Sequence, residues 1–457
     1  MSNKLKVGMI GLEIHVYLIT KEKLFCKCKA VREKGTKANN FICPICTGQP
    51  GAKPMLPNKN AVIKAVQVGL MLGCRINKKL KWMRKHYNWA DLPKGYQNTL
   101  SGDKAFPVGE QGKFYGIRIK EMHLEEDPAS WEPDSGRVDY NRSGLPLLEI
   151  VTEPDFSTSE EVTEWLKKLL HNLQYLKAVA SDAGIKSDVN VSIPGKTDRV
   201  EVKNVNSLDN IAKTIDYELE RQEKEGSVKE TRRFDEVKGK TIRMRSKEEA
   251  EDYRFIFDPD LKPIILDDNF IEEIRKKIPE TPEKKLDKLI KKYKIGKKDA
   301  EILSKNLEIV EFFESIAEKS KLAINFILPW VNVELLRHLN YNKTSLDKLD
   351  IKSEHFIELL KFVKEEKITE LQGKEILNKF YPKSFSLKER GVEEKITDSE
   401  ELDKICKEVL EKEREVVMRY RAGETKLLNF LVGEVMKKTE KRADFKVVRG
   451  LLEKILK

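Results

Sequence analysis

The feature of the sequence that most limits its fold is a change of pattern near residue 280. Before this point, short stretches of alternating apolar and polar residues are interrupted by Gly and Pro turns and by a few helical segments, as is typical of an α+β domain. From Thr281 to Lys457, Leu, Ile, Lys and Glu recur at helical spacing. The prolines of IPETPEKK mark the junction. We therefore predict an α+β fold with a β-rich first domain over residues 1–280, followed by helices.

The helical part contains a second, weaker break at YPKSFSLKERG, residues 381–391. It predicts a helical domain over residues 281–390 and a small helical tail domain over residues 391–457. In the first domain, an N-cap candidate and an apolar stripe predict a helix over residues 58–74, and a capping box predicts another over residues 157–180.

Composition argues against a membrane protein. The chain is 39% hydrophobic and 36% charged, and no apolar run approaches the roughly 18 to 20 residues of a membrane span. Glu13 and His15 interrupt the first apolar stretch, which indicates a strand and not a signal peptide. We expect a cytoplasmic protein whose cysteines stay reduced.

The charge balance points to a polyanionic partner. The formal net charge is +11, and the last 37 residues contain ten basic and five acidic side chains. A solvated Lys/Glu-rich helix surface would give the same excess, so both interpretations stay open at this point.

Four of the six cysteines lie within 21 residues, as C-x-C followed by C-x-x-C. Four thiolates on two tight turns complete the tetrahedral coordination of Zn²⁺, which leaves no open position for catalysis. The polar stretch GTKANN between the pairs cannot order itself by burying apolar surface, whereas a metal ion would fix it. We predict a structural zinc held by Cys26, Cys28, Cys43 and Cys46, the alternative being two unrelated thiol pairs.

Three predicted strands have unusual polar faces. In GLEIHVYL, the residues Glu13, His15 and Tyr17 alternate with aliphatic ones, and the same alternation recurs in SDVNVSI and RVEVK. Further acids occur in HLEEDP and in LPLLEIV, where Glu149 interrupts an apolar strand. Carboxylates with one histidine suit Mg²⁺ that carries nucleotide phosphates, and MRKHYNWADLPKGYQ supplies basic and aromatic residues. No Walker A loop is present, so a nucleotide site would be unconventional, and a merely polar sheet is the alternative.

Taken together, these segments resemble one family, the B subunit of the tRNA-dependent amidotransferase (GatB). The matching stretches follow the family's order over nearly the whole chain: GLEIHV, KLFC, PICTGQPG, DLPKGYQ, HLEED, VDYNRSGLPLLEIVTEPD, DVNVS, VEVKNVNS, ETRRFDE, MRSKEEAEDYRF, DPDL and NFLVGEVMKKT. The resemblance implies a cradle-like antiparallel β core, then a helical domain and a small tail domain that binds tRNA.

The resemblance also implies an activity. GatB-like proteins bind Glu-tRNA(Gln) or Asp-tRNA(Asn), phosphorylate the side-chain carboxylate with ATP and Mg²⁺, and let glutamine-derived ammonia displace the phosphate. Ammonia comes from a glutaminase A subunit, and a small C subunit joins the two. The related archaeal E subunit has a large inserted domain for which 457 residues leave no room, so the resemblance favours the B type.

Residue by residue, the resemblance implies three groups of site residues. The metal ligands would be His15, Glu126 and Glu149, with Glu13 and Glu125 beside them. Strand alternation alone groups Glu125 with His123, so the choice of Glu126 depends on the resemblance and would need a bulge near Asp127. The nucleotide and substrate pocket would contain Lys85, Tyr87, Lys94, Asp188, Asn190, Glu201, Lys203, Asn204 and Asn206.

The chain departs from the family in KSDVNVSIP, where a Cys and an Arg are missing, at Phe257, and in KKTEKRADFK. None of these departures touches the proposed ligands. A zinc-stabilised RNA-binding protein without catalytic activity is the competing function. It would gain nothing from acids that face a phosphate backbone, so the sequence favours the enzyme subunit.

Overall fold

The computed structural model describes residues 7–32, 35–102, 104–180, 184–246, 253–396 and 398–456. Residues 247–252 of the family stretch MRSKEEAEDYRF and residues 33–34 of the cysteine loop lie outside the described residues. The chain divides into two compact units, Met1–Thr281 and Pro282–Lys457. The further division at residue 390 stays a prediction.

The first unit is built on a large twisted sheet. Its main path runs β14-β13-β12-β11-β1-β10-β7-β5-β4-β15, and β6 continues from β7 to β2. The strands are β1 Met9–Tyr17, β2 Arg75–Ile76, β3 Lys79–Leu80, β4 Met83–His86, β5 Tyr96–Thr99, β6 Gly109–Phe114, β7 Ile117–Glu126, β8 Ser130–Glu132, β9 Arg137–Asp139, β10 Pro146–Thr152, β11 Lys186–Ser192, β12 Val200–Asn206, β13 Glu230–Asp235, β14 Lys240–Ser246, β15 Arg254–Phe257 and β16 Ile264–Ile265.

The predicted α+β fold is confirmed, with one correction to the antiparallel core. Strand β1 pairs antiparallel with both β10 and β11, and β10 pairs antiparallel with β7. In contrast, β12 and β13 are parallel, because helix α3 between them returns the chain to the same end of the sheet. The sheet is therefore mixed.

The described residues of the first unit form the helices α1 Lys59–Met71, α2 Ser159–Tyr175, α3 Leu208–Glu225 and α4 Asp268–Lys276. The two predicted helices are present, each shorter than expected. The Asn58 side chain accepts the amide protons of Asn60 and Ala61 at the start of α1. At the start of α2, Thr158 accepts from the Glu161 amide, and the Glu161 carboxylate accepts from the Ser157 amide.

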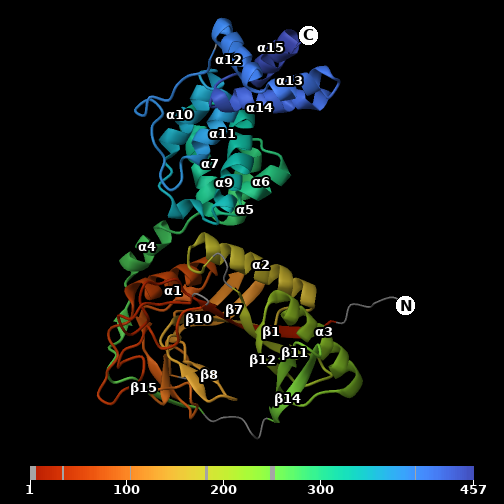
Figure 1. Ribbon diagram of the computed structural model, residues 1–457. Helices are drawn as coiled ribbons and strands as arrows, with labels where there is room; N and C mark the ends of the chain where they lie inside the picture. Colours follow the sequence, from red (N-terminus) through yellow and green to blue (C-terminus); the bar gives the residue numbers. More distant parts are fainter. Residues whose placement is uncertain are drawn as a thin grey trace. The chain divides into compact units, whose positions relative to one another are not determined.

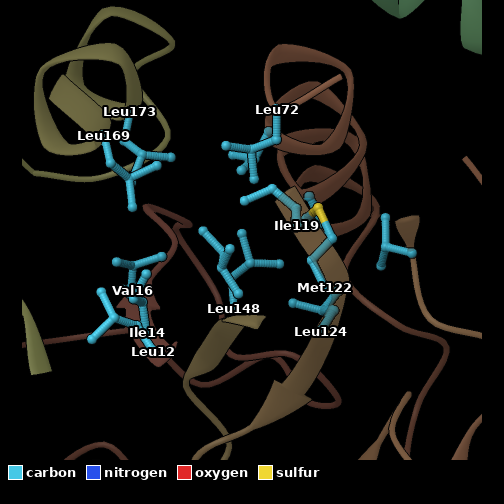
Figure 2. Close-up of a cluster of buried hydrophobic side chains, with 14 of the residues drawn as sticks. Leu12, Ile14, Val16, Leu72, Ile119, Met122, Leu124, Leu148, Leu169 and Leu173 are labelled. Atoms are coloured by element: carbon cyan, nitrogen blue, oxygen red, sulfur yellow. The ribbon is translucent and has the colours of Figure 1, made fainter. Parts of the chain in front are cut away.

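Helices α1, α2 and α3 lie on one side of the sheet, which bends away from them (Figure 1). The aliphatic residues of β1 point to this side: Figure 2 shows Leu12, Ile14 and Val16 on the side that faces Leu169 and Leu173 of α2, and all five belong to one hydrophobic cluster. All of these side chains are at most 1% exposed. Because side chains alternate along a strand, the polar residues of β1, β10 and β11 are left on the opposite, concave side.

The second unit is helical. Its elements are α5 Pro282–Lys291, α6 Lys297–Leu303, α7 Leu307–Ser320, α8 Ile324–Pro329, the π-helical turn η2 Trp330–Leu335, α9 Leu336–Tyr341, η3 Leu346–Lys348, α10 Ser353–Lys364, α11 Glu370–Asn378, α12 Ser399–Lys412, α13 Arg414–Arg421, η4 Thr425–Leu427, α14 Leu428–Lys438 and α15 Phe445–Leu456. Helices α12, α14 and α15 share a hydrophobic cluster that includes Cys406, Leu431 and Leu452. Within the described part of the chain, no helix combines the length and apolarity of a membrane span.

Candidate active site and metal centres

A row of polar side chains crosses three neighbouring strands on the concave side of the sheet. Strand register places His15 of β1 opposite Glu149 of β10, and Glu149 opposite His123 of β7. The Nε2 atoms of His15 and His123 each lie 3.6 Å from a different carboxylate oxygen of Glu149. Glu149 is thus held between two imidazoles.

Glu125 completes a group that can hold a metal ion. One ligand atom from each of His15, Glu125 and Glu149 lies within 4.8 Å of the others. Two carboxylates and one imidazole form a donor set that suits a divalent cation such as Mg²⁺. The Nδ1 atoms of His15 and His123 are buried and make no hydrogen bond to the described residues. These two nitrogen atoms are therefore left without a polar partner from the described part of the protein.

The electrostatics of this group also fit a cation. Burial and the nearby Glu149 charge raise the pKa of Glu125. Burial disfavours a charged His15, but its contact with Glu149 and the charges of Glu149, Asp188 and Glu125 together outweigh burial and raise the pKa of His15 to about 9. Without a metal ion, protons therefore balance the crowded carboxylates, and a bound cation would do the same.

Glu126 is not brought into this group. The pairing of β7 with β10 stays in register from Glu121 to Glu126, and its shift falls at Val151/Thr152 instead of near Asp127. Alternation therefore turns the Glu126 side chain away from Glu125. The Glu126 carboxylate forms an ion pair with Lys94 and accepts a hydrogen bond from the Asn98 amide at 2.9 Å. The assignment of Glu126 as a metal ligand stays a prediction, which this geometry does not favour.

A second acidic group lies further along the concave side. One oxygen from each of Glu13, Asp188 and Glu201 lies within 4.8 Å of the others. The ammonium group of Lys203 is 2.7 Å from both Asp188 and Glu201, so a cation of the protein itself already stands between these acids. Burial raises the pKa of Glu13 to about 7. The Lys203 charge opposes this increase, and the Glu149 charge adds to it.

The predicted asparagines lie around this second group. Asn204 has a positive φ of 57° and its amide donates to Asp188 at 2.7 Å, where the β11–β12 register shifts. Asn190 pairs with Glu201 in register, and its side-chain oxygen is buried without a hydrogen bond to the described residues. Asn206 is exposed, opposite Lys186.

The predicted basic and aromatic residues lie beside the first group. The Lys85 ammonium of β4 lies 4.5 Å from the Tyr253 ring centroid, and its charge lowers the pKa of Glu125 against the larger effect of burial. Among the described residues, Lys85 forms no ion pair. Burial, with the charges of Asp91 and Glu125, raises the pKa of Tyr87, whose ring also meets Tyr253. Lys85 therefore places a positive charge beside the acids. No described carboxylate neutralises this charge through an ion pair.

The four predicted cysteines converge. One sulfur from each of Cys26, Cys28, Cys43 and Cys46 lies within 4.8 Å of the others, and Cys46 Sγ is 4.0 Å from Cys28 Sγ and 3.9 Å from Cys43 Sγ. A tetrahedron with Zn–S bonds of about 2.3 Å has sulfur–sulfur edges of about 3.8 Å. The hydrogen bond from Cys26, the largest influence, lowers the pKa of Cys46 to about 5. The donor set and spacing fit a structural zinc ion.

The cysteine loop contacts two segments that lead to the polar face. Ser143 donates to the Cys46 carbonyl at 2.7 Å, and the Phe41 amide donates to Asn141 at 2.8 Å, just before β10. Gly48 approaches the other segment so closely that a Cβ atom there would lie 2.5 Å from the Pro93 oxygen, next to Lys94. The loop therefore supports the segments that lead to Glu149 and Lys94.

His123 was absent from the site residues that the resemblance implied. Its side chain is 4% exposed and contacts Glu149 directly. His123 could have been predicted as a site residue from the sequence, because alternation along HLEED places it on the same face as Glu125. The buried Lys23, which donates to the Tyr140 carbonyl at 3.0 Å beside the cysteine loop, had no such signal.

Comparison with known proteins covers both units. Residues 8–272 match a family model described as the GatB/GatE catalytic domain, and residues 311–456 match one described as the GatB domain. The chain is also similar to proteins that are named as the B subunit of an aspartyl/glutamyl-tRNA(Asn/Gln) amidotransferase. The identity is 42% to that of Methanococcus maripaludis, over 97% of both chains. It is 42% to that of Methanocaldococcus jannaschii, over 98% and 97% of the two chains, and 40% to that of Methanopyrus kandleri, over 98% of both.

Proposed function

Because the chain belongs to the GatB family of amidotransferase B subunits, we propose that it activates and amidates the side-chain carboxylate of Glu-tRNA(Gln) or Asp-tRNA(Asn). The product is Gln-tRNA(Gln) or Asn-tRNA(Asn). The partners are a glutaminase A subunit that supplies ammonia and a small C subunit.

The observation that supports this proposal most strongly is the largely buried group of His15, Glu125 and Glu149, in which Glu125 is buried and near the Lys85 ammonium. Acids that face the concave side would repel a phosphate backbone if the protein only bound RNA. The same acids suit a site that holds Mg²⁺ and nucleotide phosphates, with a lysine to neutralise the remaining phosphate charge. The competing function, a zinc-stabilised RNA-binding protein, explains the basic tail but gives these acids no role.

The chemistry requires activation because a carboxylate has no adequate leaving group for ammonia to displace. A carboxylate oxygen attacks the γ-phosphorus of ATP, the bond to the β,γ-bridging oxygen breaks, and ADP leaves. Ammonia then attacks the carbonyl carbon of the acyl phosphate, phosphate leaves with the former carboxylate oxygen, and the nitrogen loses a proton to give the amide. Catalysis of phosphoryl transfer depends mainly on positioning and on charge stabilisation.

The residues of the site can perform these tasks. We assign His15, Glu125 and Glu149 as the residues that hold Mg²⁺, with His123 positioning Glu149. When bound, the ion neutralises phosphate charge and orients the transferred group. Lys85 stabilises the phosphate oxygens, and Tyr87 lines the pocket. Lys94 fixes Glu126 and the DLPKGYQ segment.

Lys203 offsets part of the negative charge of the second acidic group, so that Glu13, Asp188 and Glu201 can lie together as a polar wall. The asparagines Asn190, Asn204 and Asn206 offer amide groups along the same strands, where they can bind the substrate. The cysteine group holds a structural zinc ion. The exposed basic residues of the tail bind the tRNA backbone.

The test is reconstitution of the complex with the A and C subunits, ATP, glutamine and mischarged tRNA. The wild-type complex should form amide only when ATP is present. Glu149→Gln keeps the shape of the side chain but removes a charged ligand, so amide formation should fall at least about a hundredfold while tRNA affinity is unchanged. Glu164→Gln, an exposed acid on the helical side, is the control and should retain full activity. Wild-type activity in Glu149→Gln would reject the assigned site.

A further inference from the structure

Two of the five tryptophans remain at the surface. Trp82, Trp165 and Trp330 are core residues, at most 4% exposed, whereas Trp89 is 47% exposed and Trp131 is partly exposed. The two surface rings contact each other edge to face, with centroids 5.9 Å apart and planes at 85°. Tryptophan is enriched at binding surfaces, so two exposed rings in contact with each other are a candidate binding site.

The pair is attached to both segments that carry the proposed active site. Trp89 lies two residues after Tyr87, and Trp131, in β8, lies five residues after Glu126. The Ala129 amide donates to the Asp91 carbonyl at 2.9 Å, so the two loops are joined directly. Figure 1 shows β8 on the side of the sheet away from α1 and α2, which is the side of the polar face.

Arg142 fixes the second loop further. Its guanidinium donates to the Pro128 carbonyl at 2.9 Å and also to the Ala129 carbonyl, and it pairs with Asp127 at 3.2 Å. The backbone that leads to Trp131 is therefore held before any ligand binds. Aromatic side chains on a backbone that is already fixed lose less conformational entropy on binding, which favours their use as a platform.

We propose that Trp89 and Trp131 form a stacking platform for the terminal nucleobase of the aminoacylated tRNA. The inference rests on the proposed function. The amino acid is esterified to the terminal ribose, so when its side chain reaches the acidic group, the adjoining base must lie nearby. The half-exposed Trp89 ring can receive a base that enters from solvent, and stacking accepts this base without requiring particular hydrogen bonds.

The test is a binding cycle that needs no catalysis. Uncharged tRNA(Gln) and tRNA(Asn) transcripts, complete or lacking the terminal nucleotide, are titrated onto the reconstituted complex with wild-type chain or Trp131→Ala. Removal of the terminal base should weaken wild-type binding roughly 5- to 150-fold, the range for one stacked base. Trp131→Ala should weaken binding of complete tRNA by a similar factor and be insensitive to the truncation. Trp131→Phe should restore most of the loss.

Tyr115→Ala is the matched control, because Tyr115 is 41% exposed and forms an edge-to-face pair with Phe114, at the opposite end of β7 from Glu125. It should bind both transcripts like the wild type. If Trp131→Ala lowers the unfolding temperature, Trp89→Leu provides the same cycle.

Equal truncation effects in wild type and the platform variants would overturn the inference. So would an increase in the KM for ATP without any change in tRNA binding, because the platform would then hold the adenine of ATP. Amide formation by the wild-type complex is measured separately. Normal amidation together with equal truncation effects in wild type and variants rejects the platform alone. If the truncation weakens binding in wild type but not in the platform variants, and no amide is formed, the proposed function alone is rejected.

Discussion

Glu125 and Glu126 are adjacent in sequence, but their replacement by Gln should have opposite effects. Glu126→Gln should lower stability and largely keep activity, whereas Glu125→Gln should keep stability and lower activity. The Lys94–Glu126 ion pair is buried, with side chains 10% and 7% exposed. Glu126→Gln still offers an oxygen to the Asn98 amide, but it leaves the Lys94 charge without its partner. Loss of one partner of a buried pair costs about 3 to 5 kcal/mol. At about 2 to 4 °C per kcal/mol for a unit of this size, the lower figure predicts a decrease in unfolding temperature of about 6 to 12 °C.

Glu125→Gln should show the reverse. Glu125 is 5% exposed, and burial together with the Glu149 charge raises its pKa, so the neutral amide of Gln replaces an acid whose charged form is disfavoured in the metal-free protein. Its unfolding temperature should not decrease, whereas amide formation should fall at least about a hundredfold.

The assays are calorimetry of the metal-free protein and amide formation by the reconstituted complex at a temperature where Glu126→Gln is folded. Glu126→Gln should then retain activity within about tenfold of wild type, since the lost charge is not a ligand. If Glu126→Gln is stable but inactive while Glu125→Gln is active, Glu126 is the ligand, as the family resemblance implied, and the reasoning from strand register is refuted.

Three further predictions concern the other groups. Cys43→Ser should lower the bound zinc from one equivalent to less than about half and expose the loop to proteolysis; a full equivalent in the variant would contradict the four-thiolate site. Lys203→Met should lower the unfolding temperature in EDTA, because three acids lose their internal cation, and Mg²⁺ should restore part of the loss; unchanged stability would show that these acids are solvated. Substitution of Arg421, Lys426 and Lys446 by Gln should make the plot of the logarithm of the tRNA binding constant against the logarithm of the salt concentration less steep, by up to about three units of slope. An unchanged slope would show that the basic excess is only a solvated surface.

The tail experiment uses substitutions because deletion of residues 421–457 would remove α14 and α15 from the cluster that covers Cys406. The exposed basic residues chosen make no ion pair among the described residues. Their loss should change charge without changing packing.

Much of the site could be predicted from the sequence because alternation is a local property. The period of two along GLEIHVYL placed His15 on the side opposite the aliphatic residues, and the structure pairs it there with Glu149, which the sequence marked only as an acid that interrupts the apolar strand LPLLEIV. The same rule grouped Glu125 with His123, and the structure agrees. The preference for Glu126 came from resemblance, and the geometry does not support it.

What could not be predicted depends on contacts between distant segments. The Lys94–Glu126 pair joins residues 32 positions apart, and neither residue signals the other in sequence. The parallel pairing of β12 with β13 follows from the path of the chain through α3, which alternation does not encode. The support that Ser143 gives to Cys46 likewise spans 97 residues and required the folded chain.

The central claim is that the substrate carboxylate is phosphorylated before it is amidated, and one isotope experiment tests it directly. The side-chain carboxylate of Glu-tRNA(Gln) is labelled with ¹⁸O, and the phosphate released during amidation by the reconstituted complex is analysed by mass spectrometry. If ATP phosphorylates the carboxylate, each amide formed should release one phosphate that contains one ¹⁸O atom. Unlabelled phosphate, formed together with amide, would contradict the account, because ATP would then be hydrolysed by water without activating the carboxylate.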